Sequence, residues 1–265
     1  MEARTTRTRR AAVAMAADGL GLAMLIGAPA RAQDATPAQM AGPACSEVLG
    51  IGMAGDACVN IVHASPDAPA VDIYVDGAAA VENLAFGATT GWVALPAGEH
   101  QVQVTPTGEA ADAAVIDATV DLMVDMAYEV AAIGAVAEIS AAVFPVDLAV
   151  TEDMENAAVR VIHASPDAPA VDIAVTGGDM LVENLAYPDA TDYLMVPAGS
   201  YDLEVRPTGT EDVALALPGT ELATGTAYSV YAVGTVADGA LTALAVPAAP
   251  EAPTAEEAQM ATPEA

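Results

Sequence analysis

Short runs of alternating apolar and polar residues, separated by turn residues, follow one another along most of the chain. The runs are rich in valine and end at proline, glycine, aspartate or threonine. This pattern is typical of half-buried strands, and no run outside the N-terminus has a convincing helical period. In the first half, the pattern predicts strands at Val59–Ala64, Val71–Val75, Thr90–Leu95, His100–Thr105, Val115–Leu122, Ala127–Ile133 and Ile139–Phe144.

The same succession of runs occurs twice. The undecapeptide from His63 to Ile73 returns unchanged from His163 to Ile173, one hundred residues later. Two copies are too few for a solenoid, so we predict two tandem domains. About seven strands per copy predict an all-β fold, with each domain an antiparallel β-sandwich of immunoglobulin-like or transthyretin-like type. Further matched segments are Glu-Asn-Leu at 82–84 and 183–185, Pro-Ala-Gly at 96–98 and 197–199, and Pro-Thr-Gly at 106–108 and 207–209.

This motif set resembles a bacterial and archaeal family catalogued as domain of unknown function 4397. Its members show a strand ending in "VIHASPDAPAVDI", then "ENL", then "VPAG" leading into "Y-x-L-x-V-x-P-T-G". The second copy carries all of these between Val161 and Gly209, whereas the first has Leu95 before Pro96 and His100 at the tyrosine position. The resemblance implies a secreted β-domain, often in tandem, and brings no established ligand or catalytic residue.

The N-terminus has the features of an export signal. A basic region that includes Arg9 and Arg10 precedes an apolar core at Gly19–Ala28 and a small-residue cleavage site at Ala30-Arg31-Ala32, which predicts a mature start near Gln33. The Sec route is favoured, and the paired arginines are a weak twin-arginine signal. An uncleaved membrane anchor is the alternative, although the apolar core is shorter than a bilayer requires. We therefore expect an extracellular or cell-envelope location, with no membrane span after cleavage.

The repeat and the flanking composition define the expected organisation. After Pro247 the chain is rich in proline, alanine and glutamate, a composition typical of disorder. The predicted segments are a signal peptide (1–32), an N-terminal segment (33–56), sandwich copy one (57–148), a linker (149–156), sandwich copy two (157–248) and a disordered acidic tail (249–265).

The chain is strongly acidic. It holds 37 Asp and Glu against seven arginines and no lysine, a formal net charge of −30. The predicted cleavage removes five arginines and only two acids, Glu2 and Asp18, which makes the charge of the mature chain more negative still. Such a field repels nucleic acid and anionic lipid, so we expect neither as a partner, and it favours weak association of cations.

Cys45 and Cys58 are the only cysteines, and both precede the first predicted strand. An even pair in an exported chain favours a structural disulfide that closes a small loop. A metal site would need more ligands, and the three histidines of the chain do not gather around these thiols. The sequence thus predicts a Cys45–Cys58 disulfide and no dedicated metal site.

The repeated undecapeptide carries the candidate site. By alternation, His163 shares a strand face with Val159 and Val161, while Arg160 and Ile162 lie on the other face, so each histidine should face the edge of the core. The following Ser-Pro-Asp-Ala-Pro predicts a turn. One reading is that histidine and aspartate hold this connection by hydrogen bonds. The other is a ligand or cation site formed in each copy by His63, Asp67 and Asp72, and by His163, Asp167 and Asp172.

Two further observations bear on chemistry. Asp72, Tyr74 and Asp76 alternate onto the outward face of a predicted strand, without the spacing of a calcium loop. Each copy also has two aromatic residues near Pro-Ala-Gly, which could pack against a sheet or form a platform for sugar or protein. These aromatic residues are Phe86 and Trp92 in copy one, and Tyr187 and Tyr193 in copy two.

No known catalytic template fits the chain. It has no G-x-S-x-G, H-E-x-x-H or P-loop pattern, and Ser65 lies too close in sequence to His63 and Asp67 for a typical triad. We therefore expect no enzyme and no cofactor. The sequence favours an exported structural or adhesion module with an envelope or extracellular partner. The alternative is a carbohydrate- or cation-binding receptor that uses the HASPDAPAVD end of each domain.

Overall fold

The computed structural model describes residues 42–249. The predicted signal peptide, residues 33–41 and the predicted tail from residue 250 onward lie outside the described residues. Domain one begins with a short helix, α1 (Cys45–Leu49). Its strands are β1 (Asp56–His63), β2 (Val71–Val75), β3 (Ala78–Leu84), β4 (Thr89–Pro96), β5 (Gly98–Pro106), β6 (Ile116–Leu122), β7 (Ala127–Ile133) and β8 (Ser140–Val146), with short 3-10 turns at Ala111–Ala113 and Val136–Glu138.

Domain two repeats this order after a 3-10 turn at Leu148–Glu152, which overlaps the start of the predicted linker. The side chain of Asp147 accepts a hydrogen bond from the backbone N–H of Ala149 at the start of that turn. The strands are β9 (Asn156–His163), β10 (Val171–Val175), β11 (Met180–Leu185), β12 (Leu194–Pro197), β13 (Gly199–Pro207), β14 (Leu215–Leu222), β15 (Ala227–Val233) and β16 (Thr242–Ala248).

Each domain is a sandwich of two four-stranded sheets. In domain one the strand orders are β4-β1-β7-β8 and β3-β2-β5-β6, and domain two repeats both orders. Most neighbours are antiparallel, but β1 pairs in parallel with β7, and β9 with β15. When the eight strands of a domain are lettered A to H in chain order, its two sheets are DAGH and CBEF. An immunoglobulin constant domain divides instead into the sheets ABED and CFG. The topology is therefore transthyretin-like, which resolves the alternative that the sequence left open.

The alternation pattern missed one strand in each domain, β3 and its counterpart β11. Each lies at the edge of its sheet, β3-β2-β5-β6 or β11-β10-β13-β14, which is the outer sheet of its domain. Strand β3 is exposed along most of its length. An edge strand with little core contact has no need of alternating apolar residues. The segment Ala78-Ala79-Ala80 accordingly lacks the valine-rich signal of the other strands.

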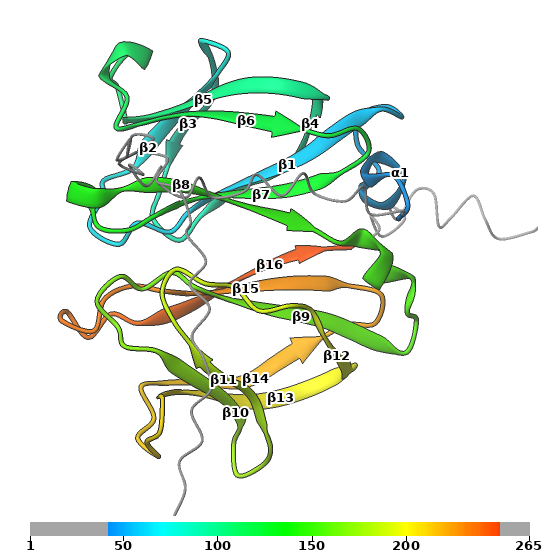
Figure 1. Cartoon of the computed structure of the whole chain (residues 1–265), viewed down its shortest axis with the longest axis vertical. Helices are drawn as coiled ribbons and strands as arrows, with labels where there is room; N and C mark the ends of the chain where they lie inside the picture. The colour runs from blue at the N-terminus through cyan, green and yellow to red at the C-terminus, as the bar shows by residue number, and fades with distance from the viewer. Residues whose placement is uncertain (1–41, 250–265) are drawn as a thin grey trace, which may run out of the picture. The chain divides into compact units, whose positions relative to one another are not determined.

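The inner sheets of the two domains are buried on both faces. In β1, Val59 and Ile61 face the core of domain one, whereas Cys58 and Val62 pack toward domain two. The strands β9, β15 and β16 present the matching face from the other side, with Ile162 at its centre. The sheets thus follow one another as four layers, with the two inner sheets face to face (Figure 1). This double burial explains why all seven residues of β7 are buried.

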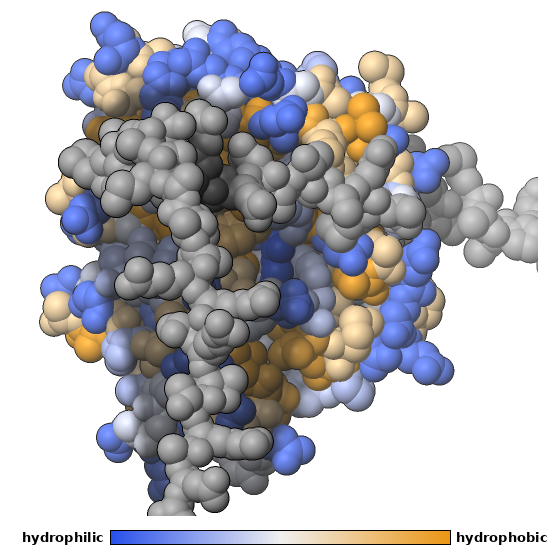
Figure 2. All heavy atoms as spheres, in the orientation of Figure 1, coloured by the Kyte–Doolittle hydropathy of each residue, from blue (hydrophilic) through white to orange (hydrophobic). Residues whose placement is uncertain are grey.

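The surface in view is mixed, with hydrophilic side chains gathered over the outer sheet of domain one at the top of Figure 2. The charged residues of the chain are mostly acidic, with 37 Asp and Glu against seven arginines. Within residues 42–249, no helix is long and apolar enough to span a bilayer.

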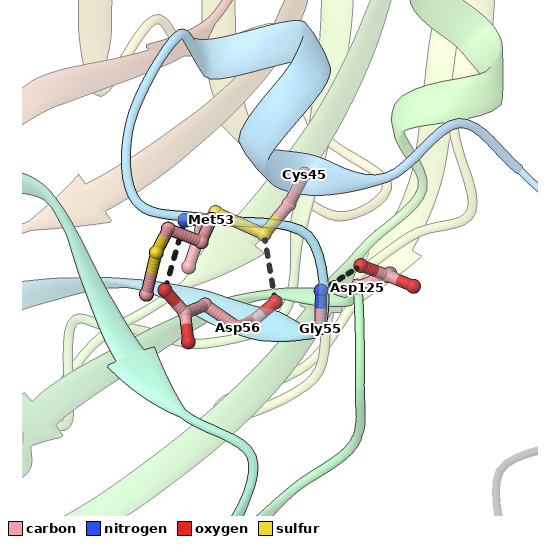
Figure 3. Close-up of a disulfide and its surroundings, with 6 residues drawn as sticks. Cys45, Met53, Gly55, Asp56 and Asp125 are labelled. Carbon is pink, nitrogen blue, oxygen red and sulfur yellow. Dashed lines mark hydrogen bonds between the residues drawn. A yellow bond between two sulfur atoms is a disulfide. The ribbon is translucent and has the colours of Figure 1, made fainter.

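The N-terminal segment is fastened to domain one by the predicted disulfide. Cys45 in α1 bonds to Cys58 (Figure 3). Cys58 lies within β1, so the expectation that both cysteines precede the first strand was wrong; β1 begins three residues before Val59 because Asp56, Ala57 and Cys58 also pair with β4. Below the disulfide, the carboxylate of Asp125 accepts a hydrogen bond from the backbone N–H of Gly55 at 2.8 Å. The disulfide therefore closes a loop that covers one end of the inner sheet.

Candidate functional site

The repeated histidines end the first strand of each domain and are fully buried. His63 is 0% exposed and His163 is 1% exposed. In each domain the ring Nε2 lies 3.0 Å from the backbone carbonyl of the second motif proline, Pro69 or Pro169. Since a carbonyl only accepts, Nε2 is the donor. Each histidine therefore closes its own motif loop, and an aromatic ring, Phe86 or Tyr187, packs edge-on against it.

The hydroxyl groups of the motif serines are buried and directed at backbone oxygens, although the backbone N–H of Ser165 donates to Nδ1 of His163 at 3.4 Å. Ser65 Oγ donates to the carbonyl oxygen of Gly134 at 2.6 Å, and Ser165 Oγ donates to that of Gly234 at 2.8 Å. Because the hydroxyl proton points at a backbone oxygen, the histidine is not placed to accept it. Serine and histidine of each motif thus form no nucleophile–base pair in this arrangement.

The first motif aspartate ties the motif loop to the loop after β7 or β15. Asp67 accepts a hydrogen bond from the N–H of Val136 at 2.8 Å. Asp167 does the same for Val236 and also accepts from the N–H of Ala237, both at 2.9 Å. These backbone donors hold the pKa of Asp167 below its ordinary value, against a smaller opposing effect of burial.

The second motif aspartate holds two turns at once. Asp72 accepts from the N–H of Asn83 at 2.7 Å and from that of Gly108 at 2.8 Å. Asn83 has a left-handed backbone, with φ of 59°, and Gly108 has φ of 88°. Asparagine and glycine adopt this region most readily, so Glu-Asn-Leu and Pro-Thr-Gly supply the turns whose N–H groups the carboxylate binds.

Domain two repeats this unit and adds one bond. Asp172 accepts from the N–H groups of Asn184 and Gly209 and from the hydroxyl of Thr208. The backbone donors, Asn184 above all, hold the pKa of Asp172 below its ordinary value; for Asp72 the largest such contribution comes from Gly108. Asp72 points away from the core, as alternation predicted, but it is only 6% exposed because the two turns cover it.

We expect acid to destabilise the chain by protonating Asp72 and Asp172. Their folded pKa values are depressed, so the stability they provide is present above the unfolded pKa and is lost as the pH falls through the folded pKa. The double variant Asp72→Asn/Asp172→Asn should be less stable at pH 7 and should depend less on pH below about 4. Urea unfolding from pH 3 to pH 7 measures this, with exposed Asp121→Asn as control. Parallel wild-type and variant curves would contradict it.

A third repeated segment is held by two different side chains. After each Pro-Ala-Gly turn, His100 Nε2 lies 2.7 Å from the carbonyl of Pro96, and Tyr201 Oη donates to that of Pro197 at the same distance. His100 also bonds to Asp76, which raises the pKa of His100. The substitution of histidine for the family's tyrosine in copy one thus keeps the hydrogen bond.

The structure places three of the six predicted ligand residues around the motif loop of each domain. It gives each of them at least one hydrogen bond to the backbone. The motif loop is bordered in domain two by a cavity lined by His163 and Ser165, among other residues. Among the described residues, no three His, Cys, Asp or Glu side chains converge as a metal site would require. Binding by these six residues remains a proposal, and their arrangement matches what holding the turns requires.

The aromatic residues noted in the sequence lie where the two domains meet. Trp92 and Tyr193 are half-buried against the cluster that contains the disulfide, and Phe86 and Tyr187 pack against the apolar cluster around Ile162. The indole N–H of Trp92 in domain one donates to the carbonyl of Pro247 in domain two at 3.0 Å. These rings therefore bury their surface in contacts between domains.

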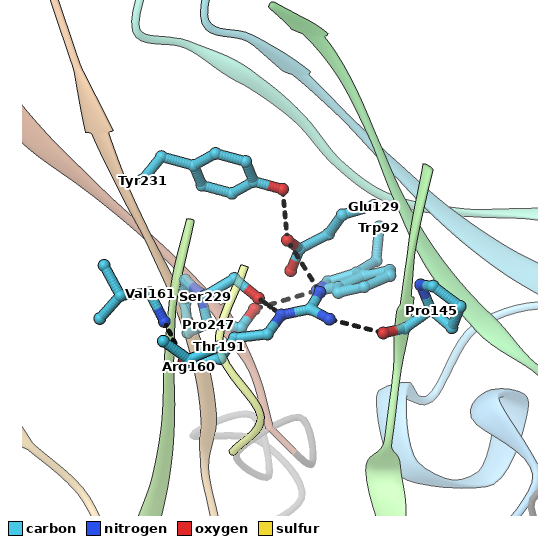
Figure 4. Close-up of polar contacts among 9 residues, drawn as sticks. All are labelled: Trp92, Glu129, Pro145, Arg160, Val161, Thr191, Ser229, Tyr231 and Pro247. Carbon is cyan, nitrogen blue, oxygen red and sulfur yellow. Dashed lines mark hydrogen bonds and ion pairs between the residues drawn. The ribbon is translucent and has the colours of Figure 1, made fainter. Parts of the chain in front are cut away.

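An arginine missed as a structural residue lies at the centre of this interface (Figure 4). Arg160 reaches from β9 into domain one, where Nη1 donates to the carbonyl of Pro145 at 2.6 Å and Nη2 lies 3.3 Å from Glu129 Oε2. Its Nε donates to Ser229 in its own domain, and Tyr231 Oη donates to the same carboxylate oxygen of Glu129 at 2.6 Å.

These groups are almost entirely removed from water. The side chains of Arg160 and Glu129 are 7% and 1% exposed. Burial raises the pKa of Glu129 despite the nearby guanidinium, and it raises the pKa of Tyr193 to about 12. The rings of Tyr193 and Phe144 lie 5.1 and 5.8 Å from the guanidinium carbon. The sequence contained a signal for this burial. Arg160 shares its strand face with the apolar residues Ile162 and Ala164, and a face exposed to solvent would not need apolar residues.

The geometry defines a pair of transthyretin-like sandwiches that share a buried interface. Models of the family described as "Domain of unknown function (DUF4397)" match the chain twice, at residues 57–174 and 157–262. Together these matches cover well over half of the chain, and they confirm the two copies that the repeat predicted. The chain belongs to this family.

Two solved structures show distant similarity to the chain. The Bacillus anthracis TIE protein matches with 10% identity and a TM-score of 0.23, over 68% of this chain and 34% of its own length, so the chain spans about a third of that protein. A "putative cell adhesion protein from Bacteroides ovatus ATCC 8483" matches with 9% identity and a TM-score of 0.23, over 75% of this chain and 98% of its own. Scores this low carry no argument about function. A search of the curated proteins finds no match.

Proposed function

We propose that the chain is an exported, non-enzymatic structural or adhesion module of the cell envelope or its surroundings, in which two sandwich domains act as one rigid unit. One observation carries this proposal. The repeated polar side chains hydrogen-bond to the backbone of their own domain, and the aromatic residues are half-buried where the domains meet. The residues that the repeat keeps are thus accounted for by folding, which leaves the outer surface for contact with a partner.

Two further features support an extracellular setting. The Cys45–Cys58 disulfide is of the kind that persists in oxidising compartments. The acidic surface, with 37 acids in the whole chain, suits solubility and weak cation association outside the cell. A buried interface with a charged centre also resists hinge motion, because separating the domains would expose both apolar faces to water.

Export is tested by fractionating cells that produce the full chain. We expect the protein outside the cytoplasm, with an N-terminus near Gln33 and no free thiol before reduction. A cytosolic product that keeps Met1 and titrates two thiols would contradict the proposal.

The competing receptor function is tested by titration. The purified mature protein is titrated with calcium and with glycans from envelope preparations, beside the Asp72→Asn/Asp172→Asn variant. For a structural module we expect no saturable binding that depends on these aspartates, while both proteins adhere equally to envelope fractions. Saturable binding that the double variant loses, with its fold intact by circular dichroism, would replace our proposal with the receptor.

A further inference from the structure

Domain two contains space between its sheets. Two adjoining cavities, of about 370 and 210 Å³, share the side chains of Val205 and Ala232. The smaller lies between the sheets and is lined by residues from all eight strands of the domain. The larger continues it to the motif end, between the loop at 165–169 and the loop at 236–241. Hydrophobic side chains are visible over this domain in the lower part of Figure 2.

The core of domain one is packed more tightly at the equivalent positions. Val59 and Val130 face its core and are each 3% exposed. One hundred residues later, Val159 and Val230 face the core of domain two from the same strand positions, yet both are only half-buried. Both valines of domain two line the smaller cavity. The two domains thus have the same fold and the same inward-facing pattern but differ in how tightly their sheets pack.

Differences in sequence accompany the looser packing of domain two. Met123 and Met126 pack against the core of domain one, whereas domain two has Ala223 and Thr226 at these positions. The equivalence is fixed by matching hydrogen bonds: Met123 and Ala223 each donate a backbone N–H to the following tyrosine hydroxyl. Strand β14 also contains one residue more than β6, with Gly219 in a left-handed conformation and a shift of register against β13. Domain two thus has smaller side chains at these two positions and a bulge in β14, a strand that lines both cavities.

The chemistry of the walls selects the ligand. No Asp, Glu, Lys or Arg lines either cavity, and the walls of the smaller are almost wholly aliphatic. Apolar cavities of about 150 Å³ stay dry and take up apolar molecules, and ligand sites typically measure about 300–1,000 Å³. An anionic headgroup would be repelled by a chain of net charge −30. We propose that domain two binds a neutral, largely hydrocarbon molecule, inserted between the sheets from the motif end.

This inference goes beyond the proposed function, and a fluorescence experiment tests it on the mature protein. Phenylnaphthylamine, a neutral dye that brightens in apolar surroundings, is titrated first. Dodecanol and dodecanoate are then added as competitors. We expect saturable binding of the dye, and displacement by dodecanol at lower concentration than by dodecanoate at neutral pH. Absence of saturable binding, or equal displacement by the anion, would overturn the proposal.

Two matched variants locate the site. Ala232→Leu fills the position that lines both cavities, and we expect it to weaken dye binding by about tenfold or more while the unfolding midpoint stays or rises. Ala132→Leu makes the same change in the more tightly packed core of domain one, where Ala132 is 5% exposed, and should lower the midpoint and leave dye binding intact. Should Ala232→Leu fail to fold, Thr220→Leu on the facing sheet replaces it. Binding that survives filling, or that Ala132→Leu abolishes, would place the dye elsewhere and refute the site.

Discussion

Replacing Arg160 with alanine is expected to lower the free energy of unfolding of the whole chain by about 3–5 kcal/mol, the cost of breaking a buried ion pair from one side. The variant leaves Glu129 buried without its cation and removes the donor from the carbonyl of Pro145. It also opens a void between the rings of Phe144 and Tyr193. Urea unfolding, followed by circular dichroism, measures the change.

Arg206→Ala is the matched control, because Arg206 is the other arginine of the described residues. It pairs with Glu204 on its own strand, where the side chains are 21% and 13% exposed. An ion pair near the surface contributes about 0–1 kcal/mol, so this variant should unfold almost like the wild type. Equal effects of the two substitutions would show that the interface contributes little to stability.

The Arg160 variant should also recover when its partner is changed. In the double variant Arg160→Leu/Glu129→Leu no charge remains buried, and such replacements are often neutral or stabilising. We therefore expect the double variant to be more stable than Arg160→Leu alone, with a coupling energy that the double-mutant cycle reports. Additive losses would mean that the two side chains do not interact.

Removing the disulfide is the second large effect we expect. The variant Cys45→Ala/Cys58→Ala opens a loop whose ends are 13 residues apart, and a loop of this size predicts a loss of about 3 kcal/mol. The loss has a structural part as well, since Val48 and Leu49 of α1 pack in the same cluster as Ala158 and Ala227 of domain two. Loosening the helix therefore uncovers one end of the interface.

The test compares the double variant with the wild type in the presence and absence of a reducing agent. Reduction should lower the unfolding midpoint of the wild type and leave that of the variant unchanged. A wild-type midpoint insensitive to reduction would contradict the proposed contribution of this bond.

The divergence of the two copies explains how the domains pair with each other. Asn60 and Glu129 are neighbours in the inner sheet of domain one, and the same two positions in domain two hold Arg160 and Ser229. In the same arrangement, two copies of domain one would place Glu129 against Asn60, and two copies of domain two would place Arg160 against Ser229, so each buried charge would lack its counter-ion. Only the mixed pair joins opposite charges, so the interface discriminates against self-association of either domain.

Much of the fold could be predicted from the sequence because its signals are local. Valine alternation located most strands, and the repeat defined the two copies. Alternation also placed His63 and His163 toward the core. The edge strands β3 and β11 were not predicted, because exposed residues carry no periodic signal. The partners across the interface were not predicted, because contacts between β1 and β9 depend on how two separate sheets meet, and the apolar second face of β9 does not say which residues it meets.

The candidate site shows the same division. Histidine, serine and aspartate close together suggested a ligand site, and their identity alone could not reveal their partners. Asp72 bonds to residues 11 and 36 positions away, Asn83 and Gly108. The repeated Glu-Asn-Leu and Pro-Thr-Gly segments were visible in the sequence, but only the fold shows that they surround the same carboxylate.

The most direct test of the central claim, that the repeated motif serves the fold, is denaturant unfolding of His163→Ala. Losing this side chain leaves the carbonyl of Pro169 without its donor, and an unpaired buried group costs about 1–3 kcal/mol. His63→Ala should act likewise in domain one through Pro69. His100→Tyr, which substitutes the residue used in domain two, serves as a near-neutral control. We expect a lowered unfolding midpoint for both alanine variants; a midpoint that is unchanged or raised would contradict the claim.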